Sequence, residues 1–303
     1  MKIDYDNVHG KFFTFVGGTR IESPNKQYLK IKVEKLLAQT RGCGSLEPED
    51  ITVSSETQQE EQFSVTERFS FVEKIVDMVA KGIQPSMVIT GEGGLGKSHT
   101  VISTLRAGGL TDVSLIEEGV DVSDIPTYRV VKGFSTAKGL FRTLFENREG
   151  LVVYDDCDSV LKDPVAVNLL KGALDSYSER IISWNAESRD EDLPRSFKFE
   201  GRVIFISNLA SYKLDQAIRS RSMCVDLSMN REQKIERMYT LINNDEFLPL
   251  VDMNVKRDAL NLIDEFKDVA KELSLRTLIS VCKIRDVNKD DSWKPLAKYM
   301  LVG

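Results

Sequence analysis

The sequence is poor in cysteine and histidine, which limits the chemistry that it can carry. Its 303 residues include four cysteines, Cys43, Cys157, Cys224 and Cys282, and two histidines, His9 and His99. The cysteines stand far apart without a CxxC pair, so they indicate neither a disulfide framework nor a zinc site, and a reducing compartment is expected. Two histidines also supply little for serine–histidine hydrolysis or for histidine-rich metal sites.

Membrane and targeting signals are also lacking. No apolar run approaches the ~20 residues that a membrane-spanning helix needs. The first ten residues, MKIDYDNVHG, have neither the basic nor the apolar region of a signal peptide. We therefore expect a cytoplasmic protein without a membrane partner.

An excess of positive charge is absent as well. The formal net charge is −6, which argues against non-specific coating of nucleic acid, because such binding needs dense Lys and Arg to displace counterions. A local basic patch is conceivable over residues 26–41, but a run of this kind more often forms a solvated helix face.

The pattern along the chain changes twice and predicts three regions, 1–63, 64–228 and 229–303. The first is an N-terminal extension or accessory segment, with a short strand over 11–16 that meets a Gly17-Gly18 turn and a helix over 27–39. From Ser64, apolar strands alternate with helices, which predicts an α/β core with a doubly wound parallel sheet covered on both faces. The predicted strands are 86–90, 128–133, 151–156 and 202–208. After about Met229 three helical segments predict a small all-α lid domain.

One segment predicts a phosphate-binding loop. GEGGLGKS fits the P-loop pattern GxxxxGK(S/T), with a strand before it and a helix after it. Glycines allow backbone conformations that turn successive N–H groups onto phosphate oxygens, and the helix N-terminus attracts the same anion. In this pattern Lys97 reaches the β- and γ-phosphates and Ser98 binds Mg²⁺. ATP and Mg²⁺ are the expected cofactors. The candidate cofactor-binding residues here are Gly91, Glu92, Gly93, Gly94, Leu95, Gly96, Lys97, Ser98 and His99, although His99 is expected to pack in the first helical turn.

Two carboxylates end the predicted strand over 151–156. A strand parallel to the one before the glycine-rich loop would carry Asp155 next to that loop, where it would hold Mg²⁺, usually through water. Asp156 could polarise the attacking water. The acidic segment could instead form a helix N-cap cluster, because Asp158 and Ser159 are good capping residues. Both interpretations can hold at once, with Asp158 capping a helix while Asp155 holds the metal.

With these motifs in place, the chain resembles the AAA+ ATPases over residues 64–290. YDDCDS resembles the DExD segment of that family, with Asp156 where the family usually has glutamate, so either the backbone lies closer to the water or hydrolysis is slow. RVIFISN resembles sensor 1 and gives that role to Asn208. A simple Asx-turn at the end of a strand is the alternative for Asn208.

Two arginine segments extend the resemblance. LDQAIRSRS resembles the family's LDPAL-x-R segment, so Arg219 and Arg221 are the candidate arginine fingers for a neighbouring subunit, with Arg221 as the first choice. LSLRTLISV gives Arg276 the place of sensor 2, although a lone arginine on a helix is as often a surface residue. The resemblance implies a homo-oligomeric ring, most often a hexamer.

The substrate stays open among three classes. Phe134, in VVKGFSTAKG, could grip an extended protein chain in the centre of a ring, or it could pack under the helix while Ser135 or Thr136 caps that helix. Phe134 and the acidic balance slightly favour an ATPase that remodels a protein partner or works with a protein adaptor. A DNA replication accessory, such as a helicase or clamp loader, is the second class. A slow, nucleotide-dependent assembly switch is the third, which Asp156 suggests.

Overall fold

The computed structural model divides the chain into two units, Met1–Gln58 and Gln59–Gly303. The residues it describes are 3–6, 11–16, 19–23, 63–117, 125–175, 179–185, 192–288, 290 and 292–303. The first unit holds a three-stranded antiparallel sheet in the order β1 (Asp4–Asp6), β2 (Lys11–Val16) and β3 (Thr19–Ser23). The strand predicted before the glycine pair is present. The turn itself, the helix expected over 27–39 and the basic run over 26–41 lie outside the described residues.

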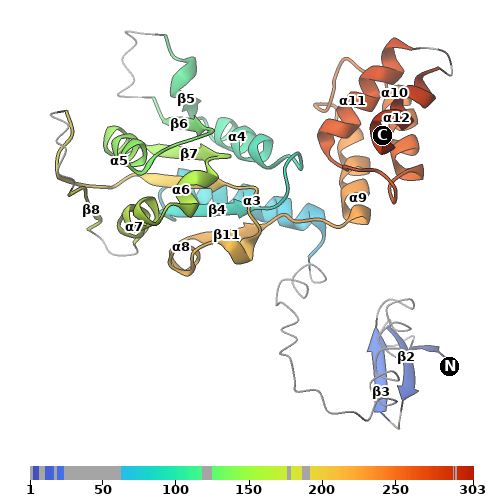
Figure 1. Ribbon diagram of the computed structural model, residues 1–303, viewed down its shortest axis with the longest axis horizontal. Coiled ribbons are helices and arrows are strands. Elements are labelled where there is room, and N and C mark those ends of the chain that lie inside the picture. The colour runs from blue at the N-terminus through green and yellow to red at the C-terminus, as the bar shows by residue number, and fades with distance from the viewer. Residues whose placement is uncertain are drawn as a thin grey trace. The chain divides into compact units, whose positions relative to one another are not determined.

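The second unit is built on a six-stranded sheet in the order β11-β4-β10-β7-β6-β5 (Figure 1). These strands are β4 (Ser86–Thr90), β5 (Thr111–Asp112), β6 (Thr127–Lys132), β7 (Leu151–Asp155), β10 (Arg202–Ile206) and β11 (Met223–Asp226). Every neighbouring pair is parallel. The predicted parallel sheet is therefore confirmed. Sequence analysis missed the two edge strands, β5 and β11, because they are short and only partly buried and lack an apolar run.

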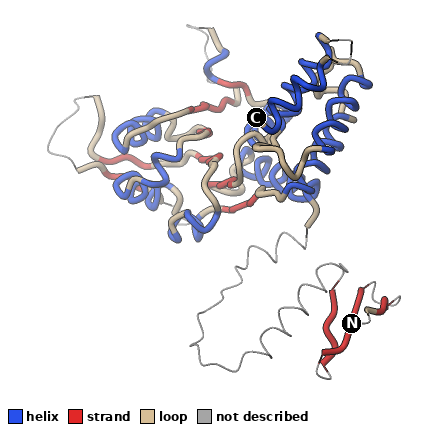
Figure 2. The backbone as a smooth tube through the Cα atoms, turned by 45° about the vertical axis from the view of Figure 1, so that its right-hand side comes forward, coloured by secondary structure: helices blue, strands red, loops and turns tan. Residues whose placement is uncertain are grey.

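Helices cover both faces of this sheet (Figure 2). Residues in β4 and β7 are all buried, so successive side chains must pack on opposite faces. Val152 and Tyr154 pack with helices α5 (Ala137–Glu146) and α7 (Pro164–Ala173). Leu151 and Val153 pack with α3 (Val65–Ala80) and α4 (Lys97–Ala107). Shorter elements complete this part: α6 (Asp158–Lys162), α8 (Gln216–Arg221), the 3₁₀ turns Val113–Leu115 and Ser211–Lys213, and the antiparallel pair β8 (Ile181–Ser183) and β9 (Ser196–Lys198).

The C-terminal part of the same unit is helical. It contains α9 (Arg231–Ile242), α10 (Met253–Glu265), α11 (Leu275–Val287) and α12 (Trp293–Val302), which bury a common apolar cluster around Leu260, Leu278 and Cys282. Three of the four helices match the predicted segments. Sequence analysis missed α12 because it contains Pro295, but that residue lies in the first helical turn, where the missing N–H removes no helical hydrogen bond. None of the helices in the described part is long and apolar enough to cross a membrane.

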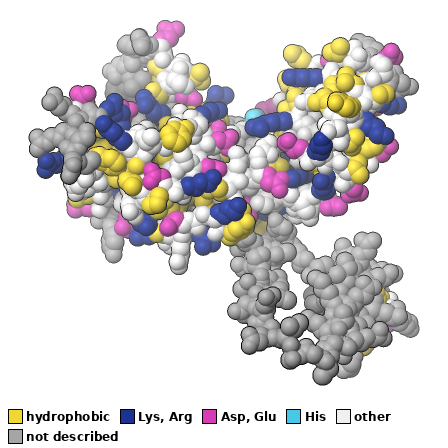
Figure 3. All heavy atoms as spheres, viewed as in Figure 1, with side chains coloured by type: hydrophobic (Ala, Val, Ile, Leu, Met, Phe, Trp, Pro, Cys, Tyr) yellow, Lys and Arg dark blue, Asp and Glu magenta, His cyan; other side chains and the backbone are white. Residues whose placement is uncertain are grey.

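Charges of both signs cover the second unit. On the face shown in Figure 3, Lys and Arg side chains are interspersed with Asp and Glu side chains. The three cysteines within the described residues, Cys157, Cys224 and Cys282, are free thiols.

Candidate functional site

The glycine-rich segment forms a tight loop between the end of β4 and the start of α4. Gly91 and Gly94 have φ values of 128° and 73°, in the range that side chains with a Cβ disfavour. Space is also restricted there. A Cβ on Gly91 would lie 2.9 Å from the carbonyl carbon of Leu227, and one on Gly94 would lie 2.9 Å from the Cβ of Ser274. The backbone path of the loop and its close contacts therefore both require glycine.

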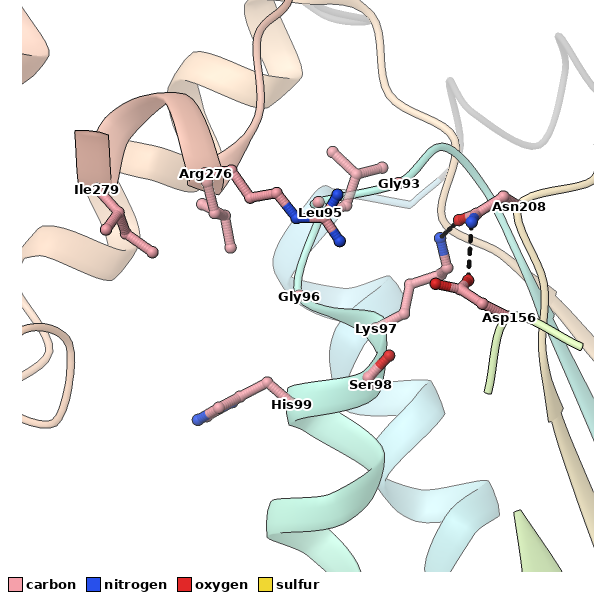
Figure 4. A pocket seen from close by; sticks show the side chains of 12 residues that line it. Gly93, Leu95, Gly96, Lys97, Ser98, His99, Asp156, Asn208, Arg276 and Ile279 are labelled. Atoms are coloured by element: carbon pink, nitrogen blue, oxygen red, sulfur yellow. Dashed lines mark hydrogen bonds between the residues drawn. The ribbon is translucent and has the colours of Figure 1, made fainter. Parts of the chain in front are cut away.

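A cavity of about 200 Å³ opens over this loop (Figure 4). Its lining residues are Gly93, Gly94, Leu95, Gly96, Lys97, Ser98, His99, Asp156, Asn208, Leu275, Arg276 and Ile279. The structure thus brings most of the sequence-predicted site residues together around one space. His99 was expected to pack in the first helical turn, and this expectation is wrong: its side chain is exposed and lines the cavity.

Lys97 is the buried cation of the site, with 5% of its surface exposed. Its Nζ donates hydrogen bonds to the carbonyl oxygens of Gly91 (2.6 Å) and Glu92 (2.7 Å) and to Oδ1 of Asn208 (2.9 Å). Burial lowers the pKa of Lys97, and the negative charges of Asp156, Asp158, Asp155 and Asp226 act in the opposite direction. The ammonium group therefore lies in a dry setting where it can neutralise an incoming anion.

Asp155 lies at the end of β7 and contacts the first turn of α4. The Ser98 hydroxyl donates a 2.6 Å hydrogen bond to Asp155 Oδ1. Strand β10 lies between β4 and β7, and the register pairs Ile206 with both Ile89 and Asp155. The three strands therefore end at the same level, which places a residue of β7 within reach of α4. Asp155 does not line the cavity itself; it is buried and contacts the lining residue Ser98.

Asp156 has a backbone conformation that is rare for residues other than glycine, with φ of 57°. Its N–H donates to the Ile206 carbonyl at 3.0 Å, and its Oδ1 accepts a 2.7 Å hydrogen bond from Asn208 Nδ2. Asn208 thus bridges Lys97 and Asp156, as Figure 4 shows. Strained backbone of this kind is concentrated at functional sites.

The expectation that Asp158 caps a helix is wrong. Helix α6 has Cys157 as its N-cap residue and no side-chain capping bond. Asp158 Oδ1 instead accepts a 2.6 Å hydrogen bond from Ser207 Oγ, and Ser159 pairs with Ser135. The three acids are thus held by separate partners: Ser98, Asn208 and Ser207.

The C-terminal helices also reach the loop. The N–H of Leu275 donates to the Gly94 carbonyl at 2.8 Å, and Lys234 of α9 forms an ion pair with Glu92. Arg276 follows in the first turn of α11, and its exposed side chain extends toward the loop near Leu95 (Figure 4). Helix α11 therefore forms one wall of the cavity, and α9 is tied to the loop through Lys234.

The two candidate finger arginines do not join the cavity. Both lie on α8, where Arg219 is exposed and Arg221 is half-buried. Arg221 Nη1 donates to the Ala217 carbonyl at 3.2 Å, and the Arg221 carbonyl accepts a hydrogen bond from Ser86 Oγ at 3.3 Å.

A second cavity, of about 290 Å³, adjoins the first and was missed by sequence analysis. The two share Gly96, His99, Leu275 and Ile279. Its other lining residues are Thr100, Arg237, Leu241, Asn244, Glu246, Phe247 and Leu248. Leu248 has φ of 50°, an unusual value for a bulky residue. No motif marks these residues, because they form a wall only where α9 and the segment after it face the start of α4 across the cavity.

Phe134 lies in the segment between β6 and α5. Its side chain is 79% exposed, so the expectation that it packs under the helix is wrong. The capping part of that expectation is confirmed: Thr136 is the N-cap of α5, and its Oγ1 accepts a 3.1 Å hydrogen bond from the Gly139 N–H.

Fold and site together define an α/β protein with a glycine-rich loop, a buried lysine and carboxylates at the ends of parallel strands. No protein-family model matches the chain. The chain is similar to an uncharacterized 36.7 kDa protein in the nrdC-mobD intergenic region of Enterobacteria phage T4. The two are 25% identical over 256 residues, which cover 77% of this chain and 73% of the phage protein.

Proposed function

We propose that this protein is a Mg²⁺-dependent ATPase of the AAA+ type, with a P-loop core and a helical lid. One observation carries the proposal: side chains from three separate strand ends converge on a single loop and cavity. Lys97 and Ser98 follow β4, Asp155 ends β7 with Asp156 directly after it, and Asn208 follows β10. Ligands of open α/β sheets bind in the crevice at the carboxyl ends of the strands, which is where these residues lie.

The residues of the loop suit a triphosphate. The N-terminus of α4 and the loop N–H groups attract an anion. Lys97 Nζ now bonds two loop carbonyls; phosphate oxygens are stronger partners for an ammonium group, because both members of the pair are charged. We therefore expect Lys97 to exchange its carbonyl partners for the β- and γ-phosphates.

The donor set near Lys97 suits Mg²⁺. The Ser98 hydroxyl and the Asp155 carboxylate are oxygen ligands, and Mg²⁺ usually takes one or two such protein ligands together with water and phosphate oxygens. The described residues contain no group of three or more His, Cys, Asp and Glu side chains that could hold a metal ion. Water and phosphate oxygens would therefore have to complete the coordination of Mg²⁺. When bound, the metal would neutralise charge on the phosphate oxygens. Asp155 would hold it, directly or through water.

Asp156 is the residue that we assign to water activation. Asn208 donates to one of its carboxylate oxygens, which leaves the other free to accept a proton from the attacking water. The Asn208 bridge also orients the carboxylate relative to Lys97. Aspartate is shorter than the glutamate of the AAA+ pattern, so we expect slow turnover by an isolated subunit.

The second cavity suits the nucleobase. Its walls include Leu241, Phe247 and Ile279, and it opens from the first cavity at Gly96. Apolar walls with a few polar groups are typical of small-ligand sites. A nucleotide with its phosphates on the loop could therefore extend its base toward α9. Arg276 would then contact the phosphates from α11.

Arg219 and Arg221 lie away from the cavity, which supports their action on a neighbouring subunit. Such action requires a homo-oligomer, and we expect a hexameric ring.

The exposure of Phe134 favours work on a protein partner over DNA handling and over an assembly switch, since an exposed aromatic side chain can grip an extended chain through apolar contact.

Titration calorimetry with Mg·ATP tests the proposal. The wild-type protein should release or absorb heat with a saturable site. The Lys97→Ala variant should bind roughly a hundredfold more weakly or not at all, because a charged hydrogen-bonding partner is lost. Thermal melting of both proteins should show that the variant folds. A wild-type protein that gives no saturable heat with Mg·ATP overturns the ATPase assignment.

A further inference from the structure

Lys132 makes a contact that the proposed function does not use. It ends β6, and the strand register places it beside Asp155, the last residue of β7. Its Nζ lies 3.4 Å from Asp155 Oδ2, while Ser98 occupies Oδ1 of the same carboxylate. The Asp155 side chain is only 8% exposed, whereas that of Lys132 is 70% exposed. One oxygen of the buried carboxylate is therefore paired with a cation that can leave for solvent.

The segment after Lys132 is tied to the segment after Asp155. The Gly133 N–H donates to the Asp155 carbonyl at 3.4 Å. Ser135 and Ser159 exchange two hydrogen bonds: the Ser135 N–H donates to Ser159 Oγ at 3.2 Å, and Ser159 Oγ donates to the Ser135 carbonyl at 3.1 Å. The exposed Phe134 thus lies between two residues that are both anchored to the carboxylate-bearing segment.

We propose that Lys132 is a positioning residue that competes with the divalent cation for Asp155, so that filling of the metal position releases Lys132 and changes the placement of Phe134. The inference rests on the proposed function, because it takes Asp155 as the metal-binding carboxylate. A divalent ion beside Asp155 repels an ammonium group a few ångströms away. The high exposure of Lys132 lets its side chain move into water, where its charge is solvated at little cost.

The first measurement is metal affinity, which needs no turnover. Mn²⁺ serves as the probe, since it takes the same oxygen ligands as Mg²⁺, and the free Mn²⁺ signal in electron paramagnetic resonance reports how much ion is bound. The protein is kept in excess over ADP. We expect Lys132→Gln to bind Mn²⁺ about two- to fivefold more tightly than the wild type, the range for loss of a partly exposed charge contact.

Two variants serve as controls for this titration. Lys132→Arg keeps the positive charge and should bind Mn²⁺ as the wild type does. Lys162→Gln removes an exposed lysine on α6 and should also leave the affinity unchanged. Unchanged or weaker binding by Lys132→Gln overturns the competition with the metal.

The second measurement follows the Phe134 position. A Phe134→Trp variant places a fluorophore there, and the parent protein corrects for Trp184 and Trp293. Adding Mg²⁺ to the ATP-bound variant should change the emission, and Lys132→Gln in the same background should reduce that change by at least half. If nucleotide and metal bind normally but the emission stays constant, the coupling is wrong while the ATPase proposal stands. If the wild type shows no nucleotide-dependent Mn²⁺ binding, the ATPase proposal falls and this one with it.

Discussion

The side chains of Ser98 and Asp155 meet in a 2.6 Å hydrogen bond although 57 positions separate them in the chain. The contact depends on β10, which lies between β4 and β7 and pairs with the ends of both at the same residue, Ile206. It also joins a hydroxyl and a carboxylate, two oxygen groups that suit Mg²⁺. The predictions below test the site around this pair.

As the pH rises, nucleotide affinity should begin to fall at a lower pH than it would with a lysine of ordinary pKa. Burial lowers the pKa of Lys97 from 10.5, so the free protein loses this charge at a lower pH. A bound triphosphate favours the charged ammonium and raises its pKa again, so binding takes up a proton in the alkaline range and weakens as the pH rises through the lowered pKa. Calorimetry in buffers of different ionisation heat between pH 7 and pH 10 measures this uptake. A constant affinity over the range would contradict it.

Asp156→Asn should keep Mg·ATP binding within about threefold and reduce turnover by about a hundredfold or more, because a general base contributes 10²–10⁴ to the rate. Asparagine tolerates the left-handed backbone, which has φ of 57° here, so the melting temperature should hardly change. Asp268→Asn, an exposed acid away from the cavity, is the matched control. Single-turnover hydrolysis by Asp156→Asn at the wild-type rate would remove the assigned role.

Gly94→Ala should destabilise the protein more than Gly109→Ala does. Both glycines have positive φ, 73° and 83°, so each substitution costs about 1 kcal/mol through the backbone. A Cβ on Gly109 meets nothing within 4 Å, whereas one on Gly94 lies 2.9 Å from Ser274 Cβ. We therefore expect Gly94→Ala to lose at least about 1 kcal/mol more. Urea unfolding measures the free energies, and equal losses would show that the loop does not press on α11.

Arg219→Ala and Arg221→Ala should leave Mg·ATP binding by single subunits unchanged. At concentrations where subunits assemble, the variant that lacks the finger should lose about a hundredfold or more in hydrolysis, since an arginine finger contributes 10³–10⁵. Mixing the finger variant with Asp156→Asn should restore part of the activity, because one subunit then supplies the arginine and its neighbour the intact carboxylate. Full activity of both single variants would place the finger elsewhere.

The core of the candidate site could be predicted because its residues follow local patterns. A glycine-rich turn before Lys97 and a buried run before Asp155 are visible in short stretches of sequence, and each marks the end of a strand. The wall formed by Leu241, Phe247 and Leu248 could not be predicted. These residues resemble any apolar helix face or loop, and only the packing of α9 against the core brings them to the cavity.

The same division explains the misplaced residues. Phe134 looks like a core residue by its chemistry, yet its side chain is exposed, and the hydrogen bonds between Ser135 and Ser159 tie its loop to α6. Asp158 is a good capping residue by type, yet Ser207, 49 positions away, takes its carboxylate. In both cases a contact distant in sequence outweighed a local preference.

The sequence by itself determined the class of the fold, the strand ends that carry polar groups and the loop that needs glycine, because periodicity, burial and backbone freedom act over a few residues. The tertiary structure alone decided that β10 separates β4 from β7, that Lys132 pairs with Asp155 and that the C-terminal helices reach Gly94. Such relationships depend on strand order and on packing between distant segments, which no short stretch of the chain encodes.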